Sequence, residues 1–283
     1  MKIPKRIQPL VDDGLVDSVL QQLMSGKEAT VYIVQCGDFI RCAKVYKEAS
    51  KRSFKQAVLY SEGRKVRSGR RARAMEKSSK FGREQQENIW QNAEVDALYK
   101  LAEAGVRVPQ PYGCFEGVLL MDLITDEDGS AAPRLNDISM SEEQALEDHT
   151  EIMSFIVSML NVGIIHGDLS EFNVLVDERG PVIIDLPQAV DASANNNAKK
   201  MLLRDVDNMT RYYAQFAPQL AQSKYGQEIW ALYEKGLLSA STVLTGKFFE
   251  KDEITNVSNV LDEISTARQE YEDNIQRKQD FDL

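Results

Sequence analysis

The sequence predicts an α+β protein in which a small β-rich lobe is followed by a mainly helical lobe. Strand-like segments gather in the first 124 residues, and long segments with helical periodicity come later. An apolar strand-like segment at residues 118–124 connects the two parts. Strands first and helices later are typical of α+β architectures, whose active sites commonly lie in a cleft. We therefore expect a two-lobed enzyme, with one lobe over residues 1–124 and a second over residues 125–283.

The first lobe is expected to open with a helix and to continue into a hairpin. Residues 10–22 carry Leu and Val at spacings of three to five positions, which favours a helix. Two apolar segments, residues 31–34 and 39–46, flank a turn at Gly37-Asp38 and predict a β-hairpin. Ser25-Gly-Lys-Glu-Ala-Thr30 precedes the hairpin as a turn with one glycine.

The segment 51–83 is strongly basic. It holds 12 of the chain's 34 Lys and Arg residues but only two of its 44 Asp and Glu residues, so it carries +10 and the remainder carries −20. Because it shows few aliphatic residues and no sustained period, it predicts a flexible loop or a loosely helical insertion. An acidic chain with one basic segment favours a localised anionic partner. A helix is expected next, over about residues 84–104, with Gly105 as its stop.

The second lobe begins with the clearest helix signal. Ser141 is an expected N-cap for a helix that runs to about Leu160, because Gln144 completes a capping-box pattern. Two β segments, residues 174–176 and 182–185, then flank a turn. From about Leu202 the pattern is mostly helical, and the tail after about Glu250 is polar and charged, with no predicted placement.

An ordered set of polar residues gives the strongest functional signal. Asp168 and Asn173 lie in His166-Gly-Asp-Leu-Ser-Glu-Phe-Asn173, and Asp185 follows the second β segment. This spacing is typical of phosphoryl transfer, in which the first Asp handles the proton of the nucleophile while the Asn and the second Asp hold Mg²⁺. Hard oxygen ligands suit Mg²⁺, which completes its shell with water and phosphates. His166 is expected to brace the loop, and His149 to be a surface or boundary residue.

Two further features fit a nucleotide site. Lys44 stands between apolar residues in the second strand of the hairpin, where it can reach α- and β-phosphates, and Glu94 is its expected partner. The turn from Ser25 to Val31 is a candidate phosphate-covering loop, since its backbone N–H groups and the Ser25 hydroxyl can meet a triphosphate. Taken singly, these features also fit an ordinary strand lysine, a helix-face carboxylate and a plain hairpin entry.

Seven short segments, within a range from about residue 15 to residue 213, form a shared pattern. They are Ser25-Gly-Lys-Glu-Ala29, Ala43-Lys-Val-Tyr46, Arg52-Ser-Phe-Lys55, Val108-Pro-Gln-Pro111, Leu119-Leu-Met-Asp122, the octet that ends at Asn173, and Ile184-Asp-Leu-Pro-Gln188. Together they resemble the RIO family of atypical serine/threonine protein kinases, in the bacterial form of the subfamily without an N-terminal winged helix. The turn with one glycine and the Asp-Leu-Pro-Gln sequence differ from ordinary protein kinases.

The resemblance implies a reduced protein-kinase-like fold, with the whole chain forming one RIO kinase domain. It makes Asp168 the catalytic Asp, acting with Lys44 and Asp185, and it makes Asn173 and Asp185 the ligands of Mg²⁺, with Mn²⁺ as the alternative metal. Met121 would stand at the back of the adenine pocket. The full set of expected ATP-binding residues is Ser25, Gly26, Lys27, Val31, Lys44, Glu94, Met121, Asp122, Ile124 and Asn173.

The expected activity is ATP- and Mg²⁺-dependent phosphorylation of Ser or Thr in proteins, the chain itself included. The sequence does not identify the protein substrate. One alternative is a RIO-type ATPase switch in ribosome maturation that carries phosphate on Asp185, with the segment 51–83 contacting ribosomal RNA. A small-molecule kinase of the aminoglycoside or choline type and a non-enzymatic binding module are the other readings.

The composition indicates the class of protein and its cellular compartment. With 43% hydrophobic and 28% charged residues, the sequence is typical of a soluble globular protein. No apolar run approaches the roughly 20 residues that span a bilayer, and the N-terminus lacks the apolar core of a signal peptide. The three cysteines are odd in number and show no Cys-x-x-Cys spacing, which fits a reducing compartment. We therefore expect a cytoplasmic protein without membrane contact.

Overall fold

The computed structural model describes residues 2–26, 28–47 and 93–248 of the chain. The described residues up to Lys247 belong to one compact unit. The expectations for Lys27, for the basic segment and for the tail lie outside the described residues.

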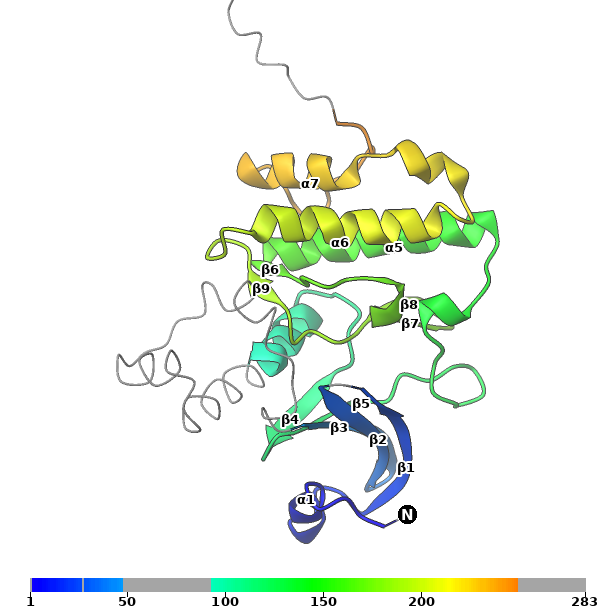
Figure 1. Cartoon of the computed structure of the whole chain (residues 1–283), viewed down its shortest axis with the longest axis vertical. Coiled ribbons are helices and arrows are strands. Elements are labelled where there is room, and N and C mark those ends of the chain that lie inside the picture. The colour runs from blue at the N-terminus through cyan, green and yellow to red at the C-terminus, as the bar shows by residue number, and fades with distance from the viewer. Residues whose placement is uncertain (1, 27, 48–92, 249–283) are drawn as a thin grey trace, which may run out of the picture. The chain divides into compact units, whose positions relative to one another are not determined.

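An antiparallel sheet of five strands dominates the first part of the chain (Figure 1). The strand order is β1-β2-β3-β5-β4, so β5 pairs with β3 although a long stretch of chain separates them. The expected hairpin is confirmed as β2 and β3, with Gly37 in the left-handed region at φ 61°. The strands are β1 (Ser18–Ser25), β2 (Ala29–Cys36), β3 (Phe39–Tyr46), β4 (Pro111–Phe115) and β5 (Val118–Asp122).

The helix expected over residues 10–22 is wrong in most of its length. Helix α1 spans only Gln8–Asp12, and Gly14 at φ 71° follows its end. The rest of that stretch forms a bend and then β1, an edge strand of the sheet. Two register shifts, between Val19 and Gln21 and between Gln22 and Met24, interrupt the pairing with β2. They remove the two-residue alternation that would have indicated a strand.

Both faces of β3 are buried from Cys42 to Tyr46, and this fixes where Lys44 points. Ala43 and Val45 belong to an apolar cluster with Leu10 of α1. Tyr46 belongs to a larger core that continues into the second half of the chain. Because side chains alternate along a strand, Lys44 lies on the same face as Tyr46, turned toward that second half.

The expected helix before Gly105 is present over residues 93–103, the part of it that the structure describes. It supplies Leu98 and Leu101 to the larger core. Gly105 follows at φ 77°, as a helix stop requires.

Three helices form the main layer of the second part. They are α5 (Glu142–Asn161), α6 (Ala198–Tyr213) and α7 (Tyr225–Glu234), which pack side by side (Figure 1). The predicted N-cap is confirmed, since Ser141 Oγ accepts a hydrogen bond from Gln144 N at 3.1 Å. The Gln144 side chain instead donates to Asp148, so the reciprocal half of the capping box is not formed. Helix α6 begins at Ala198, earlier than expected.

Short elements lie between these helices. The hairpin of β7 and β8 pairs Val174 with Ile183, and Ile184 N also donates to Asn173 O at 3.0 Å. This pairing brings residues 173 and 185 to the same end of the hairpin. The short elements are η3 (Leu135–Asp137), β6 (Ile164–Ile165), η4 (Glu171–Asn173), β7 (Val174–Asp177), β8 (Gly180–Ile183), β9 (Val190–Asp191) and η5 (Pro218–Gln222).

The predicted α+β order is confirmed. One continuous apolar core joins Leu119 of the sheet to Leu169 and Ile183 and to the helices. The expected lobe boundary at residues 124 and 125 stays a prediction. Within the described part of the chain, no helix combines the length and the apolar character needed to cross a bilayer.

Candidate active site

Lys44 is the centre of the candidate site. Its Nζ donates to Glu94 Oε1 at 2.6 Å and to Asp185 Oδ1 at 2.7 Å. The three side chains come from β3, from the helix of residues 93–103 and from the segment after β8. The predicted contact between Lys44 and Glu94 is therefore present, and Asp185 joins it. A second donor, Tyr46, binds the other oxygen of Glu94 at 2.5 Å, so this buried carboxylate is held at both ends.

The charges of this group support one another. Burial opposes the charged form of Lys44, but the attraction of Asp185 and Glu94 outweighs it and raises the pKa of Lys44. The same Lys44 charge is the main cause of a lowered pKa at Asp185. Lys44 is 8% exposed and Glu94 is 2% exposed, so their pair is shielded from water and from salt. Lys44 is consequently a fixed positive charge, and Asp185 is an anion near neutral pH.

Asp185 has an unusual backbone. Strand β8 ends at Ile183, and Asp185 adopts φ 66°, a conformation that non-glycine residues rarely take. Such strain costs on the order of 1–3 kcal/mol and persists where the surroundings hold the residue in place. Here the Lys44 contact supplies that hold. The Asp185 side chain is still 47% exposed, so it is open to a ligand from solvent.

Asn173 is oriented by the loop that carries Asp168. Its Nδ2 donates to the backbone oxygen of Asp168 at 2.9 Å. Because this bond uses the donor end of the amide, the carbonyl oxygen is the end that can meet a cation. Asn173 and Asp185 thus offer hard oxygens from one end of the β7–β8 hairpin.

The oxygen donors fit Mg²⁺ bound together with phosphates. Among the described residues, no group of three or more His, Cys, Asp or Glu side chains is arranged to hold a metal alone. A cation at Asn173 and Asp185 would need further ligands, and Mg²⁺ commonly takes them from water and substrate phosphates.

Asp168 is exposed, and side-chain and backbone groups orient it. Gln188 Nε2 donates to Asp168 Oδ2 at 3.2 Å, and the Asp168 backbone N–H donates to His166 Nδ1 at 3.3 Å. Partial burial raises the pKa of Asp168, while the charge of Arg204 opposes that rise. Gln188 was predicted only as part of a motif, and the structure gives it a contact with the carboxylate.

His166 braces the loop, as expected. It is 1% exposed, and its Nε2 pairs with Ile184 O at 3.0 Å, next to Asp185. With Nδ1 accepting from Asp168 N, the ring carries its proton on Nε2. Burial lowers the pKa of His166, so the ring is neutral and links the Asp168 loop to the Asp185 segment.

Asp205 of α6 is a site residue that sequence reasoning missed. Its carboxylate is 2% exposed and accepts from Gly167 N at 2.7 Å and from Leu169 N at 3.2 Å, on either side of Asp168. Burial raises the pKa of Asp205 to about 7, against the effect of these N–H donors and of Arg204. Asn208, one turn later, donates to Leu169 O at 3.0 Å. Helix α6 therefore holds the loop through two polar residues.

The predicted phosphate-covering turn is described in part. Gly26 N donates to Ala29 O at 2.9 Å, and Gly26 O accepts from the Lys47 ammonium, which also contacts Ser25 Oγ at 3.3 Å. Val31 lies opposite Lys44 in the β2–β3 ladder. The structure thus brings the end of the turn next to Lys44.

The predicted adenine segment follows β5. Met121 lies opposite Cys42 of β3. Asp122 N donates to Gln110 O and Ile124 O accepts from Ala132 N, each at 3.0 Å. These bonds use the N–H of Asp122 and the carbonyl of Ile124. Recognition of an adenine edge would therefore rest on the Asp122 carbonyl and the Ile124 N–H.

The expectation for His149 is wrong. It is 1% exposed, and its Nε2 pairs with Thr210 Oγ1 of α6 at 3.1 Å. Its ring also packs against Tyr213 and Tyr225. Burial lowers the pKa of His149 to about 4. The sequence places His149 on a helix but does not show which face α6 and α7 cover.

Comparisons with known proteins agree on one family. The family model described as "RIO domain" matches residues 30–225. The RIO-type serine/threonine-protein kinase Rio1 of Haloferax volcanii is 29% identical over 73% of this chain and 67% of its own length. The serine/threonine-protein kinase RIO1 of Chaetomium thermophilum is 26% identical over 72% of this chain, which spans only 41% of that relative.

A solved structure shows the same fold. The Rio2 kinase of Chaetomium thermophilum, in an ADP/Mg²⁺-phosphoaspartate complex, matches with a TM-score of 0.53 and 20% identity. The match covers 83% of this chain and 73% of that one. The expected reduced kinase-like architecture is therefore confirmed at the level of the fold.

Proposed function

The chain belongs to the RIO domain family, and on that premise we propose that it is a protein kinase that transfers the γ-phosphate of ATP to Ser or Thr hydroxyls, its own included. The observation that carries this proposal is the Lys44 ammonium held between Glu94 and Asp185 beside the Asp168 loop. The relatives named serine/threonine-protein kinases support the choice of acceptor.

Each side chain has a defined task in this reaction. Lys44 neutralises α- and β-phosphate oxygens, and Glu94 keeps it extended toward them. Asp168 accepts the proton of the acceptor hydroxyl while that oxygen bonds to the γ-phosphorus, and the bond to the leaving ADP breaks. Bound Mg²⁺ supplies positive charge on the transferred phosphoryl group, and Asn173 and Asp185 would hold it there.

Two segments are proposed to recognise the nucleotide. The Ser25–Val31 turn covers the phosphates, with Lys47 fixing the turn through Gly26 O. The Asp122 carbonyl and the Ile124 N–H pair with the adenine edge, and Met121 closes the back of that pocket. The resemblance to the RIO family implies the roles of Met121, Asp122 and Ile124, and nucleotide-binding measurements on variants test them.

A second candidate is an ATPase switch that carries phosphate on Asp185. The half-exposed Asp185 carboxylate favours it, since one oxygen binds Lys44 and solvent reaches the group. The phosphoaspartate of the Rio2 complex belongs to that protein and supports the chemistry by likeness of fold. The match of the RIO domain model to residues 30–225 disfavours a small-molecule kinase.

One experiment separates the two candidates. Purified protein is incubated with γ-labelled ATP and Mg²⁺, together with Asp168→Ala and Asp185→Ala, and any label is challenged with acid and with hydroxylamine. Acid-stable label that both substitutions abolish supports the kinase. Label lost to hydroxylamine and dependent on Asp185 supports the switch. If wild-type protein neither gains label nor hydrolyses ATP, both candidates fail.

Ribosomal RNA is a proposed partner of the basic segment 51–83, on the ground of its charge alone. Neutralising Arg70, Arg71 and Arg73 is then expected to abolish a salt-dependent shift of ribosomal RNA. No shift of the wild-type protein at low salt would exclude this partner.

A further inference from the structure

Helix α6 carries a basic hollow on its outer face. The hollow has a volume of about 480 Å³, and its lining includes Lys199, Lys200, Arg204 and Arg211 with Asp207 as its one carboxylate. Lys200, Arg204, Asp207 and Arg211 recur at three- to four-residue spacing, so they form a stripe along one side of the helix, and Lys199 lies beside its first member. The stripe from Lys199 to Arg211 is about 18 Å long at the rise of an α-helix. We call it the α6 hollow.

In the part of the chain that the structure describes, two of the four basic residues of the α6 hollow lack an acidic partner, whereas Arg204 lies 3.8 Å from the Asp205 carboxylate. Within the described residues, neither Lys199 nor Lys200 has a carboxylate in ion-pair distance, although both are exposed. The chain as a whole has a net charge of −10, so carboxylates are abundant elsewhere. Like charges on one helix face repel one another. A ligand with negative charges would relieve that repulsion, whereas a merely solvated face gains nothing from the clustering.

The α6 hollow adjoins the candidate active site. Arg204 lines it, and its Nη2 lies 3.8 Å from Oδ1 of Asp205. The next residue, Asp205, holds the backbone on both sides of Asp168. A polypeptide with its hydroxyl at Asp168 therefore has the start of the hollow within reach of its flanking residues.

We infer, on the premise of the proposed protein-kinase function, that the α6 hollow binds acidic residues that flank the phosphorylated Ser or Thr of a protein substrate. Separate carboxylates of a peptide can each meet Lys199, Lys200 or Arg204 and avoid Asp207. A nucleic-acid backbone presents evenly spaced phosphates and would place one against Asp207, so it fits the hollow less well. The substrate is thereby selected both by its acceptor hydroxyl at Asp168 and by the negative charge of the flanking residues in the α6 hollow.

Direct binding tests this inference without relying on turnover. Fluorescence anisotropy compares a labelled Ser peptide flanked by Asp and Glu with the same peptide carrying Asn and Gln. For the double variant Lys199→Gln/Lys200→Gln, the Kd of the acidic peptide is expected to rise about five-fold, the loss expected from two exposed ion pairs. The Kd of the neutral peptide is expected to stay unchanged. Raising the salt concentration should weaken acidic-peptide binding more in wild type than in the variant.

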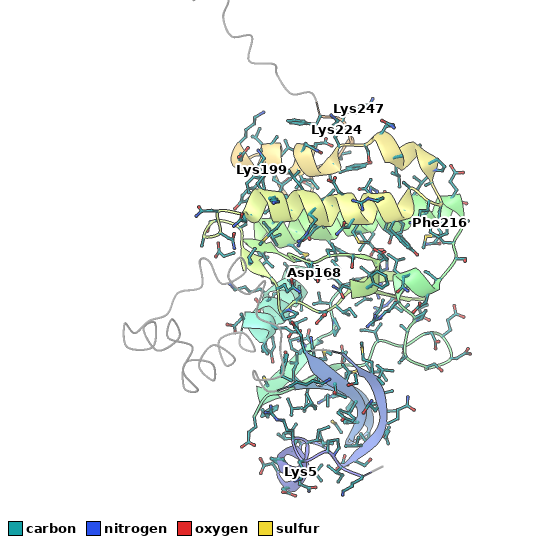
Figure 2. The ribbon with its side chains drawn as sticks, viewed as in Figure 1. Lys5, Asp168, Lys199, Phe216, Lys224 and Lys247 are labelled. Atoms are coloured by element: carbon teal, nitrogen blue, oxygen red, sulfur yellow. The ribbon has the colours of Figure 1, made fainter. Side chains whose placement is uncertain are left out.

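A matched control removes the same charge elsewhere. The variant Lys2→Gln/Lys5→Gln alters two exposed lysines near α1, whereas Lys199 lies at the start of α6 (Figure 2). This control should bind the acidic peptide as wild type does. Self-labelling with ATP on the same preparations shows whether the kinase proposal itself holds, independently of peptide binding.

Three results with the peptides would each overturn the inference. They are equal wild-type affinities for the acidic and neutral peptides, an acidic-peptide Kd that the Lys199→Gln/Lys200→Gln change leaves unaltered, and an equal loss in the control variant. A fourth result concerns a single-stranded RNA oligonucleotide. If the RNA binds wild type, loses affinity in the Lys199→Gln/Lys200→Gln variant, and the acidic peptide does not bind wild type, the inference is also overturned. The α6 hollow is then assigned to nucleic acid.

Discussion

At the scale of single residues, the candidate site depends on contacts between segments far apart in the chain. Lys44 meets Glu94 and Asp185, which are 50 and 141 positions away. Asp168 is oriented by Gln188 from 20 positions away. Each polar group is placed by another, so the site responds to changes in residues that do not touch the substrate.

Gln188 is expected to act as a positioning residue for Asp168. In Gln188→Ala the carboxylate loses an N–H donor, and kcat should fall about 10- to 150-fold, the effect of a hydrogen bond to a charged group. The Kd of Mg²⁺-ATP should not change. The surface variant Gln219→Ala, which removes an exposed contact to Glu142, serves as the control and should keep wild-type kcat.

The charge variant Gln188→Glu gives a sharper readout. A second carboxylate beside Asp168 disfavours its ionised form and raises its pKa. Because the ionised form accepts the proton, the acidic limb of the kcat–pH profile should move to higher pH. An unmoved limb, together with normal kcat in Gln188→Ala, would rule out this role.

Asp205 is expected to stabilise the Asp168 loop. In Asp205→Asn one acceptor oxygen becomes an NH₂ group, which leaves Gly167 N–H or Leu169 N–H unpaired in a buried position. The free energy of unfolding should fall by about 1–3 kcal/mol, the cost of a buried unsatisfied donor. Urea unfolding measures it. A midpoint equal to that of wild type would show that the two N–H bonds contribute nothing.

The sequence identified the polar residues of the candidate site, but not most of the residues that contact and orient them. Asp168, Asn173, Asp185 and Lys44 could be identified from the sequence because each belongs to a strand or a loop whose pattern is visible locally. The contacts of Gln188, Asp205 and Tyr46 depend on how α6 and the residue 93–103 helix pack, and no local period encodes that packing. Their chemical types alone did not mark them.

At the scale of elements, the packing of α5 against α6 includes a buried polar pair. His149 of α5 contacts Thr210 of α6, with Tyr213 and Tyr225 around the ring. The pair lies in the helical layer rather than beside the candidate site. It couples the stability of that layer to pH.

Acid is expected to destabilise the protein through His149. Burial keeps the folded-state pKa of His149 at about 4, below its ordinary value of 6.5. The neutral ring is favoured in the fold, so its contribution to stability is fully present above pH 6.5. It is lost as pH falls toward 4, to a total of about 3 kcal/mol. Urea unfolding at several pH values measures this loss.

The variant His149→Gln provides the comparison for that measurement. It retains a polar group for Thr210 but does not titrate, so its unfolding free energy should depend less on pH between 6.5 and 4 than that of wild type. The carboxyl groups of the chain contribute equally to the pH dependence of unfolding in both proteins. Parallel curves for the two proteins would exclude His149 as the cause.

Prediction of elements succeeded where the pattern was regular. The β2–β3 hairpin and the Ser141 cap were predicted because a Gly turn and a capping serine act locally. The edge strand β1 was mistaken for a helix because its pairing with β2 is shifted twice, and the side chains of Leu20, Leu23 and Met24 are exposed. An exposed edge strand with irregular pairing carries no clear period.

At the scale of the whole molecule, one apolar core runs from the sheet into the helical layer, so the two sides of the site are held by common packing. Lys44 and Glu94 enter from one side, and Asp168, Asn173 and Asp185 from the other. The order of elements and the RIO domain match over residues 30–225 agree with this arrangement. The central claim is that these side chains transfer phosphate from ATP, with Asp168 as the base.

The rate of phosphate transfer by Asp168→Asn, compared with wild type at saturating Mg²⁺-ATP, tests that claim most directly. The amide keeps the size of the side chain but cannot accept the hydroxyl proton, so kcat should fall about 10²- to 10⁴-fold. The Kd of Mg²⁺-ATP, measured on the same preparations, should be unchanged. Transfer within a few-fold of wild type at equal nucleotide affinity would contradict the claim.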